Sequence, residues 1–525
     1  MAPTLAPGDF VAEVAALRDL ASAVAAKLAA ASTRMRTLGR ERAVLRLLGV
    51  SGTDREGRPL AAEVADRYAG GRPGLLASGI ALPFCLALQE YDSDPQQLAL
   101  DVASGAVDLS LEAELLASPD RRASAVGHLQ TLLAGAVERI DANRTARAEL
   151  FALLGDRELP WIGTTLLESS AHGGALEAAN LVRGGADLIR VEVPVGRELA
   201  LRLGELGQDV AAWHADRDDE PDPAPAGSQR GLAHVRDALD RAAAERGAYV
   251  RLATVPTALA GPEGAIVAAF ERVDLLELDP MGEIVGTGVD PVRALADFAF
   301  AARVARRAGT ILLLPAGPLV VAPDMDSGVN SDPATRAGRA LGLQLLAVGL
   351  AARHGLDPGS LVIGALPAWL ADETYAAARA AAEVAIRRVL MKDHPLAFLE
   401  PAGHDGEGRW AAIVAAVAPG SGTGLVLRRA AAGMMFDQVA AGNRASAEVA
   451  RQLDDALGSR TLDGEARRHA EGSLAAAART LEQLGADGWA AITGATAERT
   501  GWGRLGGDAV ALADDPIDSV ERALA

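Results

Sequence analysis

The chain has 525 residues, of which 50% are hydrophobic, 23% charged and 3% aromatic, a composition that ordinary globular proteins share. Its 51 basic and 70 acidic side chains give a formal net charge of −19, which argues against nucleic acid or an anionic membrane as a partner. A single cysteine, Cys85, allows neither an intramolecular disulfide nor a cysteine-rich metal centre. The sequence has no uncharged apolar run of membrane-spanning length, and MAPTLAPGDFVAEV does not resemble a signal peptide. We therefore expect a cytoplasmic protein.

The first part of the chain is predicted to be helical. From residue 8 to about 155, apolar residues recur at helical spacing, as in VAEVAALRDLASAVAAKLAAAS. We expect an N-terminal helical region over residues 1–158.

From Trp161 onward, short apolar runs alternate with amphipathic helices. Strand–helix alternation predicts parallel pairing with crossover helices, and eight units over roughly 270 residues match a closed (β/α)8 TIM barrel. Periodicity alone leaves an open, doubly wound sheet as the alternative. We expect the barrel over residues 159–430. The eight predicted strands span residues 161–169, 187–194, 248–256, 273–280, 310–317, 360–367, 395–403 and 423–430.

After residue 430 the pattern returns to helix, which predicts a C-terminal helical extension over residues 431–525. The acidic, proline-rich stretch WHADRDDEPDPAPAGSQ, residues 213–229, interrupts the connection between the second and third strands. Its composition is typical of a solvated loop or a partly disordered segment.

Polar residues stand near the ends of several predicted strands. Catalytic residues of barrels gather at the carboxyl ends of the strands, so we expect these side chains to converge on one cavity at the barrel mouth. Each of them taken alone can equally be a helix cap or a salt-bridge partner. The predicted mouth residues are Glu168, Glu192, Arg251, Glu277, Asp279 and Glu400.

Short motifs add little to this prediction. No phosphate-binding P-loop, no H-E-x-x-H motif and no pair of nearby histidines occurs, so we expect no metal site. The segment ESSAHGG places Ser169, Ser170 and His172 after the first strand and before a helix N-terminus, which can hold an anion. A capping loop is the alternative reading of this segment. No D-x-H-x-x-G motif, which would supply a histidine to cobalamin cobalt, is present.

Three segments resemble the large (alpha) subunit of lysine 5,6-aminomutase: RERAVLRLLGVSGTD, NLVRGGADLIRV and RGAYVRLATVPTALAGPEGAIVAAFERVDLLELDPM. The likeness covers most of the chain and includes the order of elements. It implies an isomerase that moves a terminal amino group to the adjacent carbon by a radical mechanism, with adenosylcobalamin and pyridoxal phosphate at the barrel mouth. It also implies a hetero-oligomer, because a small beta subunit with the D-x-H-x-x-G domain carries most of the cobalamin in that family.

The resemblance also implies roles for residues at the mouth. Asp279 would bind the ammonium group of an amino-acid substrate, Arg251 would pair with a carboxylate, and Tyr249 would lie against the pyridine ring of the cofactor. Arg251 and Asp279 are expected to share one part of the mouth, since they lie near the ends of adjacent strands, the third and the fourth; a plain salt bridge is the alternative. The residues expected to contact cofactor are Glu168, Ser169, His172, Glu192 and Arg197.

The sequence also departs from the family pattern. Val193 and Glu198 replace the arginine and serine that hold the pyridoxal phosphate group, and a glutamate there would repel a phosphate. Substitution of the missing arginine by the neighbouring Arg197 is the alternative. DRDDEPDPAPAGSQ replaces a Gly- and Thr-rich cofactor loop, and GALPAWLA replaces a GHAFEMNP segment on the sixth strand. Two further hypotheses therefore stand beside the aminomutase. The chain can be a divergent cobalamin-linked barrel with another substrate and no pyridoxal phosphate, or a non-catalytic binding or assembly subunit. An unrelated barrel enzyme is the remaining alternative.

Overall fold

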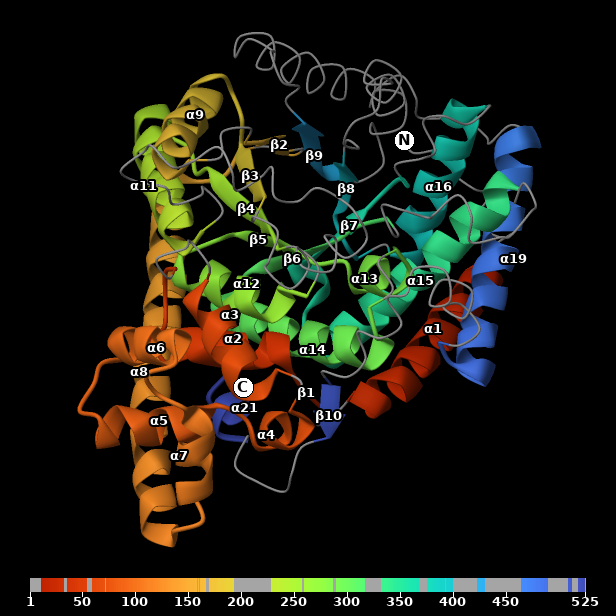
Figure 1. The fold of residues 1–525 in the computed structure, drawn as a ribbon. Helices are drawn as coiled ribbons and strands as arrows, with labels where there is room; N and C mark the ends of the chain where they lie inside the picture. Colours follow the sequence, from red (N-terminus) through yellow and green to blue (C-terminus); the bar gives the residue numbers. More distant parts are fainter. Residues whose placement is uncertain are drawn as a thin grey trace, which may run out of the picture.

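Eight parallel strands close into a barrel at the centre of the molecule (Figure 1). The strands pair in chain order and the last pairs with the first, so the closed barrel expected from the sequence is confirmed. The computed structural model describes residues 11–32, 35–53, 59–70, 72–157, 159, 161–166, 170–192, 228–256, 259–286, 289–316, 332–367, 375–391, 393–399, 423–429, 464–489, 509–511 and 518–524. The strands are β2 (Trp161–Thr165), β3 (Leu188–Glu192), β4 (Arg251–Val255), β5 (Leu275–Glu277), β6 (Ile311–Leu314), β7 (Leu361–Gly364), β8 (Leu396–Leu399) and β9 (Thr423–Arg429).

The barrel strands are apolar on both faces because the inner face fills the barrel and the outer face packs under helices. Alternate residues point inward, and those at mid-height form a separate hydrophobic cluster inside the barrel. This inner cluster is built from Leu188, Ala253, Leu275, Leu313, Val362, Ala397 and Leu425.

Helices cover the outside of the barrel (Figure 1). Their starts carry sequence signals, such as Ser228 and Asp290, whose side chains accept hydrogen bonds from the first helical turn. The helices that follow barrel strands are α9 (Ala171–Arg183), α11 (Gln229–Arg246), α12 (Gly261–Phe270), α13 (Pro280–Gly286), α14 (Pro291–Ala308), α15 (Pro333–Arg353), the 3-10 turn η2 (Pro358–Ser360) and α16 (Ala376–Leu390). No helix in these described ranges is long and apolar enough to cross a membrane.

The N-terminal region is helical, with one exception that the sequence analysis missed. A short strand, β1 (Met35–Thr37), pairs antiparallel with β10 (Ala509–Ala511) near the other end of the chain. Strands of three residues are too short to leave a periodic signal. The helices of this region are α1 (Val11–Ser32), α2 (Leu38–Leu47), α3 (Leu60–Ala69), α4 (Pro73–Ser78), α5 (Ala81–Glu90), α6 (Pro95–Ser104), α7 (Leu109–Leu115) and α8 (Pro119–Leu154).

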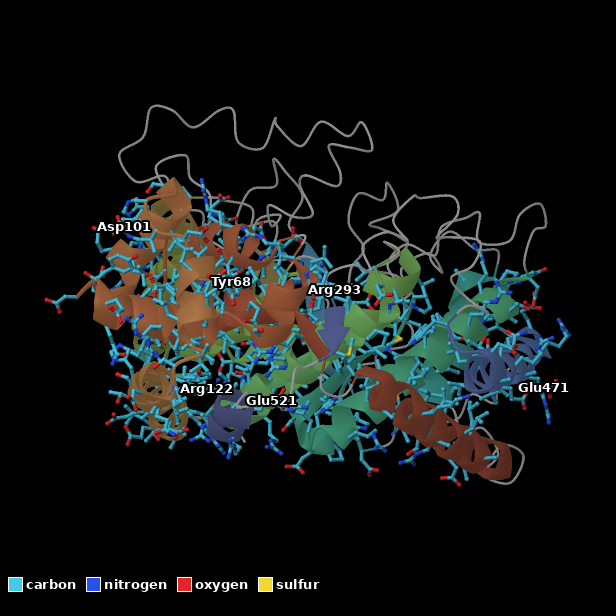
Figure 2. The ribbon with its side chains drawn as sticks, turned by 60° about the horizontal axis from the view of Figure 1, so that its bottom comes forward. Tyr68, Asp101, Arg122, Arg293, Glu471 and Glu521 are labelled. Atoms are coloured by element: carbon cyan, nitrogen blue, oxygen red, sulfur yellow. The ribbon has the colours of Figure 1, made fainter. Side chains whose placement is uncertain are left out.

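Two helices of the predicted C-terminal extension are described, α19 (Gly464–Asp487) and α21 (Asp518–Leu524). Helix α19 lies alongside α15, and α21 lies beneath the barrel in contact with α8 and α14 (Figure 1). Glu521 of α21, labelled in Figure 2, forms ion pairs with Arg40 at 3.1 Å and with Arg303 at 2.7 Å. The C-terminal end of the chain is therefore bound both to the N-terminal region and to a barrel helix. The division of the chain at residues 158 and 430 stays a prediction.

Candidate active site

The carboxyl end of the barrel carries a half-buried arginine between two glutamates. Arg190 donates from Nε to Glu277 Oε2 at 3.0 Å and from Nη1 to Glu192 Oε1 at 2.8 Å. Burial alone would lower the pKa of Arg190, but Glu277 and Glu192 raise that pKa above its ordinary value. The structure thus brings the predicted mouth residues Glu192 and Glu277 together, through an arginine that the sequence analysis did not include among the site residues.

Asp279 lies two residues beyond β5, at the same end of the barrel. Its Oδ1 accepts the Gly282 N–H at 2.8 Å, so the carboxylate caps α13. A Cβ atom at residue 282 would collide with this carboxylate, which explains the glycine. Burial raises the pKa of Asp279 to about 6; Glu277 adds to this rise, and the Gly282 hydrogen bond opposes it. Asp279 is therefore a carboxylate whose charge is costly and which a bound cation would stabilise.

A fourth mouth acid, Glu283 on α13, has an even higher pKa than Asp279. Burial, followed by the nearby Asp297 and Asp279, raises the pKa of Glu283 to about 8. The region just beyond β5 therefore holds carboxyl groups that are less readily ionised than ordinary ones.

Arg251 and Tyr249 lie at the amino end of the barrel, and the prediction that they face the mouth is wrong. Arg251 is the first residue of β4 and forms a bidentate pair with Asp156, with both N–O distances 2.7 Å. Its guanidinium carbon stands 3.4 Å from the ring centroid of Trp161. The Tyr249 hydroxyl donates to Asp274 at 2.8 Å. These contacts close the floor of the barrel.

The expected pairing of Arg251 with Asp279 is wrong for the same reason. Ala253 is the register partner of Leu275, so Arg251 lies two residues below this level and Asp279 four residues above it. Six residues at 3.3 Å each separate the two side chains by roughly 20 Å along the strands. The third strand was predicted from residue 248, but residues 248–250 precede β4, so Arg251 stands at the start of the strand and not near its end.

The remaining predicted site residues fall into two groups. His172 is exposed in the first turn of α9, and its neighbour Ser170 caps that helix by accepting the Gly173 N–H at 3.1 Å. The capping reading of ESSAHGG is thus confirmed for Ser170. Other residues singled out in the sequence lie outside the described residues: Glu168, Ser169, Val193, Arg197, Glu198 and Glu400.

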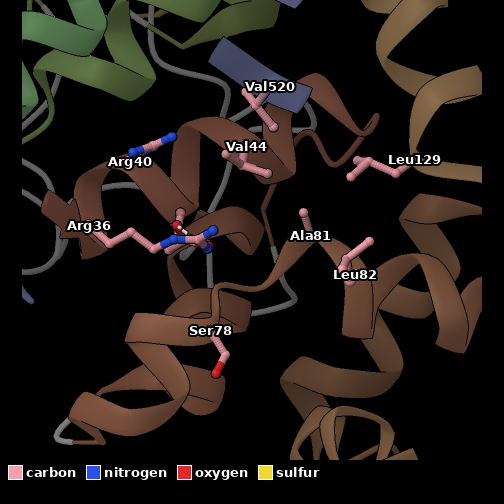
Figure 3. A pocket seen from close by; sticks show the side chains of 9 residues that line it. Arg36, Arg40, Val44, Ser78, Ala81, Leu82, Leu129 and Val520 are labelled. Carbon is pink, nitrogen blue, oxygen red and sulfur yellow. Dashed lines mark hydrogen bonds and ion pairs between the residues drawn. The ribbon is translucent and has the colours of Figure 1, made fainter. Parts of the chain in front are cut away.

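Two cavities found among the described residues lie away from the mouth. One, of about 30 Å³, lies between the N-terminal helices and α21 and is lined by Arg36, Arg40 and Ser78 among others (Figure 3). At that volume it holds about one water molecule. The other, of about 170 Å³, is a groove between α15 and α19. Neither includes a residue of the Arg190 network.

The fold and the mouth residues together define a closed (β/α)8 barrel whose carboxyl end is acidic. Comparison of the sequence with known proteins identifies the family. Residues 10–408 match the family model of the D-lysine 5,6-aminomutase TIM-barrel domain of the alpha subunit, and the chain belongs to this family. The lysine 5,6-aminomutase alpha subunit of Acetoanaerobium sticklandii is 27% identical over 275 residues, covering 52% of this chain and 49% of that protein. The alpha subunit of Fusobacterium nucleatum subsp. nucleatum is 28% identical over 273 residues, with the same coverage.

The alignment with these curated relatives spans about half the length of each. Among solved structures, phospho-2-dehydro-3-deoxyheptonate aldolase from Thermotoga maritima matches 57% of this chain and 71% of its own. The identity is 12% and the TM-score 0.34.

Proposed function

We propose that this chain is the barrel subunit of an aminomutase-type isomerase, which moves an amino group of an amino-acid substrate to the adjacent carbon. The observation that carries the proposal is the family match over residues 10–408, which includes every described mouth residue. The partner would be a small subunit that carries a D-x-H-x-x-G cobalamin domain, in a cytoplasmic hetero-oligomer.

The charge of the described mouth supports a cationic substrate group. Arg190 contributes one positive charge, and Glu192, Glu277 and Asp279 contribute three negative charges, which leaves −2 when these four are ionised. Glu283, whose pKa is about 8, is mostly protonated at neutral pH and is not counted. A substrate ammonium would relieve this excess, and in a partly buried site the attraction exceeds its value in water. We assign the ammonium contact to Asp279, because Glu277 and Glu192 already hold Arg190.

The described residues fit a phosphate poorly. Arg190 is the cation that the described mouth offers, and two carboxylates engage it. A phosphate dianion placed there would meet net negative charge. We therefore derive no step through pyridoxal phosphate. The same observation favours, as a second candidate function, a cobalamin-linked barrel that acts on an amine without that cofactor.

Adenosylcobalamin, when bound, would supply a carbon radical that abstracts hydrogen from the substrate. None of the described residues is assigned to hold it, and no group of three metal-ligating side chains occurs in the described ranges. In our proposal the partner carries the corrin, as the resemblance to the family implies. This chain's part is to bind the ammonium at Asp279, to hold Glu277 and Glu192 through Arg190, and to surround the substrate so that water is excluded.

The test is turnover by the assembled complex. The chain would be co-expressed with a small D-x-H-x-x-G protein encoded beside it and supplied with adenosylcobalamin, with and without pyridoxal phosphate. Diamino acids, including both enantiomers of lysine, would be screened for an isomer with a migrated amino group. We expect turnover that Asp279→Asn lowers about 100-fold or more, as for loss of a key ionic contact.

The outcomes separate the candidates. Turnover only with pyridoxal phosphate supports the aminomutase, and turnover without it supports the second candidate. Failure to form a complex, together with no turnover of any diamino acid, would overturn both.

A further inference from the structure

Helix α19 lies outside the residues that match the family model, yet it packs tightly on the barrel. It runs beside α15 and also touches α16 (Figure 1). Two glycines of α15 allow this close approach: a Cβ at Gly338 would collide with the Ser473 carbonyl, and one at Gly342 would meet the Ala477 carbonyl at 3.1 Å. The position of α19 on α15 is therefore specific to within a residue.

A buried polar network joins α19 to the barrel. Glu383 and Arg387 of α16 form an ion pair in which both side chains are 0% exposed. Glu383 Oε1 also lies 3.0 Å from His469 Nε2 and accepts the Ser473 hydroxyl at 3.0 Å. Both of these partners are buried residues of α19. Burial alone would raise the pKa of Glu383, but Arg387 and His469 lower it to about 2. Glu383 is thus a charged group that α19 helps to stabilise.

The network continues to the mouth of the barrel. Arg387 Nε donates to Gln344 Oε1 at 2.8 Å, and Gln344 Nε2 donates to the carbonyls of Pro315 at 2.7 Å and Gly364 at 2.9 Å. Pro315 directly follows β6, and Gly364 is the last residue of β7. A Cβ at Gly364 would collide with the backbone of Pro315 and its neighbour, so the two strand ends are in close contact.

From these contacts we propose that α19 is a positioning element of the barrel mouth, with His469, Ser473 and Gln344 as positioning residues. Through Glu383 and Arg387, α19 sets the orientation of the Gln344 amide, and that amide holds the carboxyl ends of β6 and β7. Buried ion pairs are weak sources of stability compared with apolar packing. Apolar packing alone would hold α15, α16 and α19 together without a buried ion pair. We therefore assign the Glu383–Arg387 pair to fixing the geometry of the strand ends.

The proposal is tested first on the backbone, without any turnover. Amide hydrogen exchange would be measured on the full chain at residues 311–314, 316 and 361–366, with residues 251–255 of β4 as an internal reference. Gln344→Met keeps the side-chain size and removes the amide, and His469→Leu removes the α19 contact. We expect exchange at the β6 and β7 ends to rise about tenfold in both, with β4 unchanged. His469→Gln, which keeps an N–H donor, should stay within about twofold of the parent.

Leu481→Ala provides the matched control, because Leu481 is a buried residue of α19 outside the network. It should loosen α19 and leave the exchange of the β6 and β7 ends near the parent value. If Leu481→Ala raises exchange at these ends as much as His469→Leu does, or if all variants raise it uniformly across the barrel, α19 acts by packing alone and the proposal is wrong. Ser473→Ala, a milder change, provides the same comparison if Gln344→Met does not fold.

The expected effect of α19 on turnover rests on the proposed function. In an active complex, His469→Leu should lower kcat more than it raises KM, and His469→Gln should restore kcat. An inactive complex would leave the exchange result standing, so failure of the proposed reaction and failure of the positioning role are distinguishable.

Discussion

The two ends of the barrel hold acids in contrasting surroundings. At the floor, three aspartates that precede strands, Asp156, Asp187 and Asp274, each pair with at least one arginine. Beyond the mouth end of β5, Asp279 and Glu283 have pKa values raised to about 6 and about 8, with burial as the main cause. The floor acids are neutralised within the chain, whereas these two mouth acids are costly to ionise.

Because of this difference, we expect the floor acids to determine the stability of the fold and the mouth acids to determine the affinity for a ligand. A buried pair with both partners in place is neutral within the fold, and removing either partner leaves an uncompensated charge. A strained carboxylate lowers stability and is relieved when a cation binds. We therefore expect variants of the floor acids to lose stability and keep ligand affinity, and removal of the Asp279 charge to raise stability and lower affinity.

The largest effect is expected at the floor. Asp156→Ala removes both hydrogen bonds of a bidentate pair and leaves the buried Arg251 guanidinium against Trp161 without its carboxylate. We expect the free energy of unfolding to fall by about 3 kcal/mol, at the lower end of the range for buried pairs because Asp156 is partly exposed. Urea unfolding would measure this loss, and binding of a diamino acid should not change. A variant as stable as the parent would contradict the closed floor.

At the mouth, Glu277→Gln should have a smaller and more complex effect. The amide keeps the shape of the side chain, and Arg190 retains Glu192, so we expect a loss of about 1–2 kcal/mol. The variant should also lower the pKa of Asp279 toward its ordinary value, because the Glu277 charge contributes to the rise. The pH dependence of stability, compared with the parent between pH 4 and 7, measures this shift. An unchanged profile would show that Glu277 does not act on Asp279.

Much of the fold was predictable because barrel strands leave a strong local signal. All eight runs identified in the sequence became barrel strands, and their ends moved by at most four residues. β1 and β10 were missed, because three-residue strands joined across almost the whole chain have no local pattern.

The candidate site was less predictable than the fold. The mouth positions of Asp279 and Glu277 were predicted correctly, because both residues stand at the carboxyl end of β5. Arg251 was assigned to the wrong end of the barrel. A side chain's position along a strand depends on where the strand begins, which composition locates only to within a few residues. Arg190 was missed as a site residue although a signal existed: in LIRVE it stands two residues before Glu192, on the same inward face.

Asp279→Asn should raise stability at neutral pH. The pKa of Asp279 is about 6 in the folded chain and near 3.8 in an unfolded one. As the pH rises from about 4 to about 6, the unfolded state loses its proton first, so the folded parent becomes less stable, and the loss persists above pH 6. Asparagine keeps an acceptor for the Gly282 N–H and carries no charge. We expect a gain of about 1–2 kcal/mol at pH 7.

Urea midpoints of parent and Asp279→Asn at pH 4 and pH 7 check this sign. The difference between the two proteins should be small at pH 4 and larger at pH 7, and affinity for a diamino acid should fall. An equal difference at both values would mean that Asp279 is not strained, and the contrast between floor and mouth would not extend to it.

The smallest stability effect is expected from Glu192→Gln. The Glu192 side chain is 43% exposed and is the outer of the two partners of Arg190, at 2.8 Å. Exposed ion pairs contribute little, and Glu277 alone suffices to balance the arginine, so stability should change by less than about 0.5 kcal/mol. The same variant changes the charge of the described mouth from −2 to −1, so a diamino acid should bind several-fold more weakly, with a larger difference at low salt.

Glu471→Gln on α19 is the matched control, because Glu471 pairs with Arg467 at an exposed site far from the mouth residues. If both variants leave affinity unchanged, the mouth does not recognise its ligand through charge. A large stability loss from Glu192→Gln alone would instead make the mouth glutamates structural, like the aspartates of the floor.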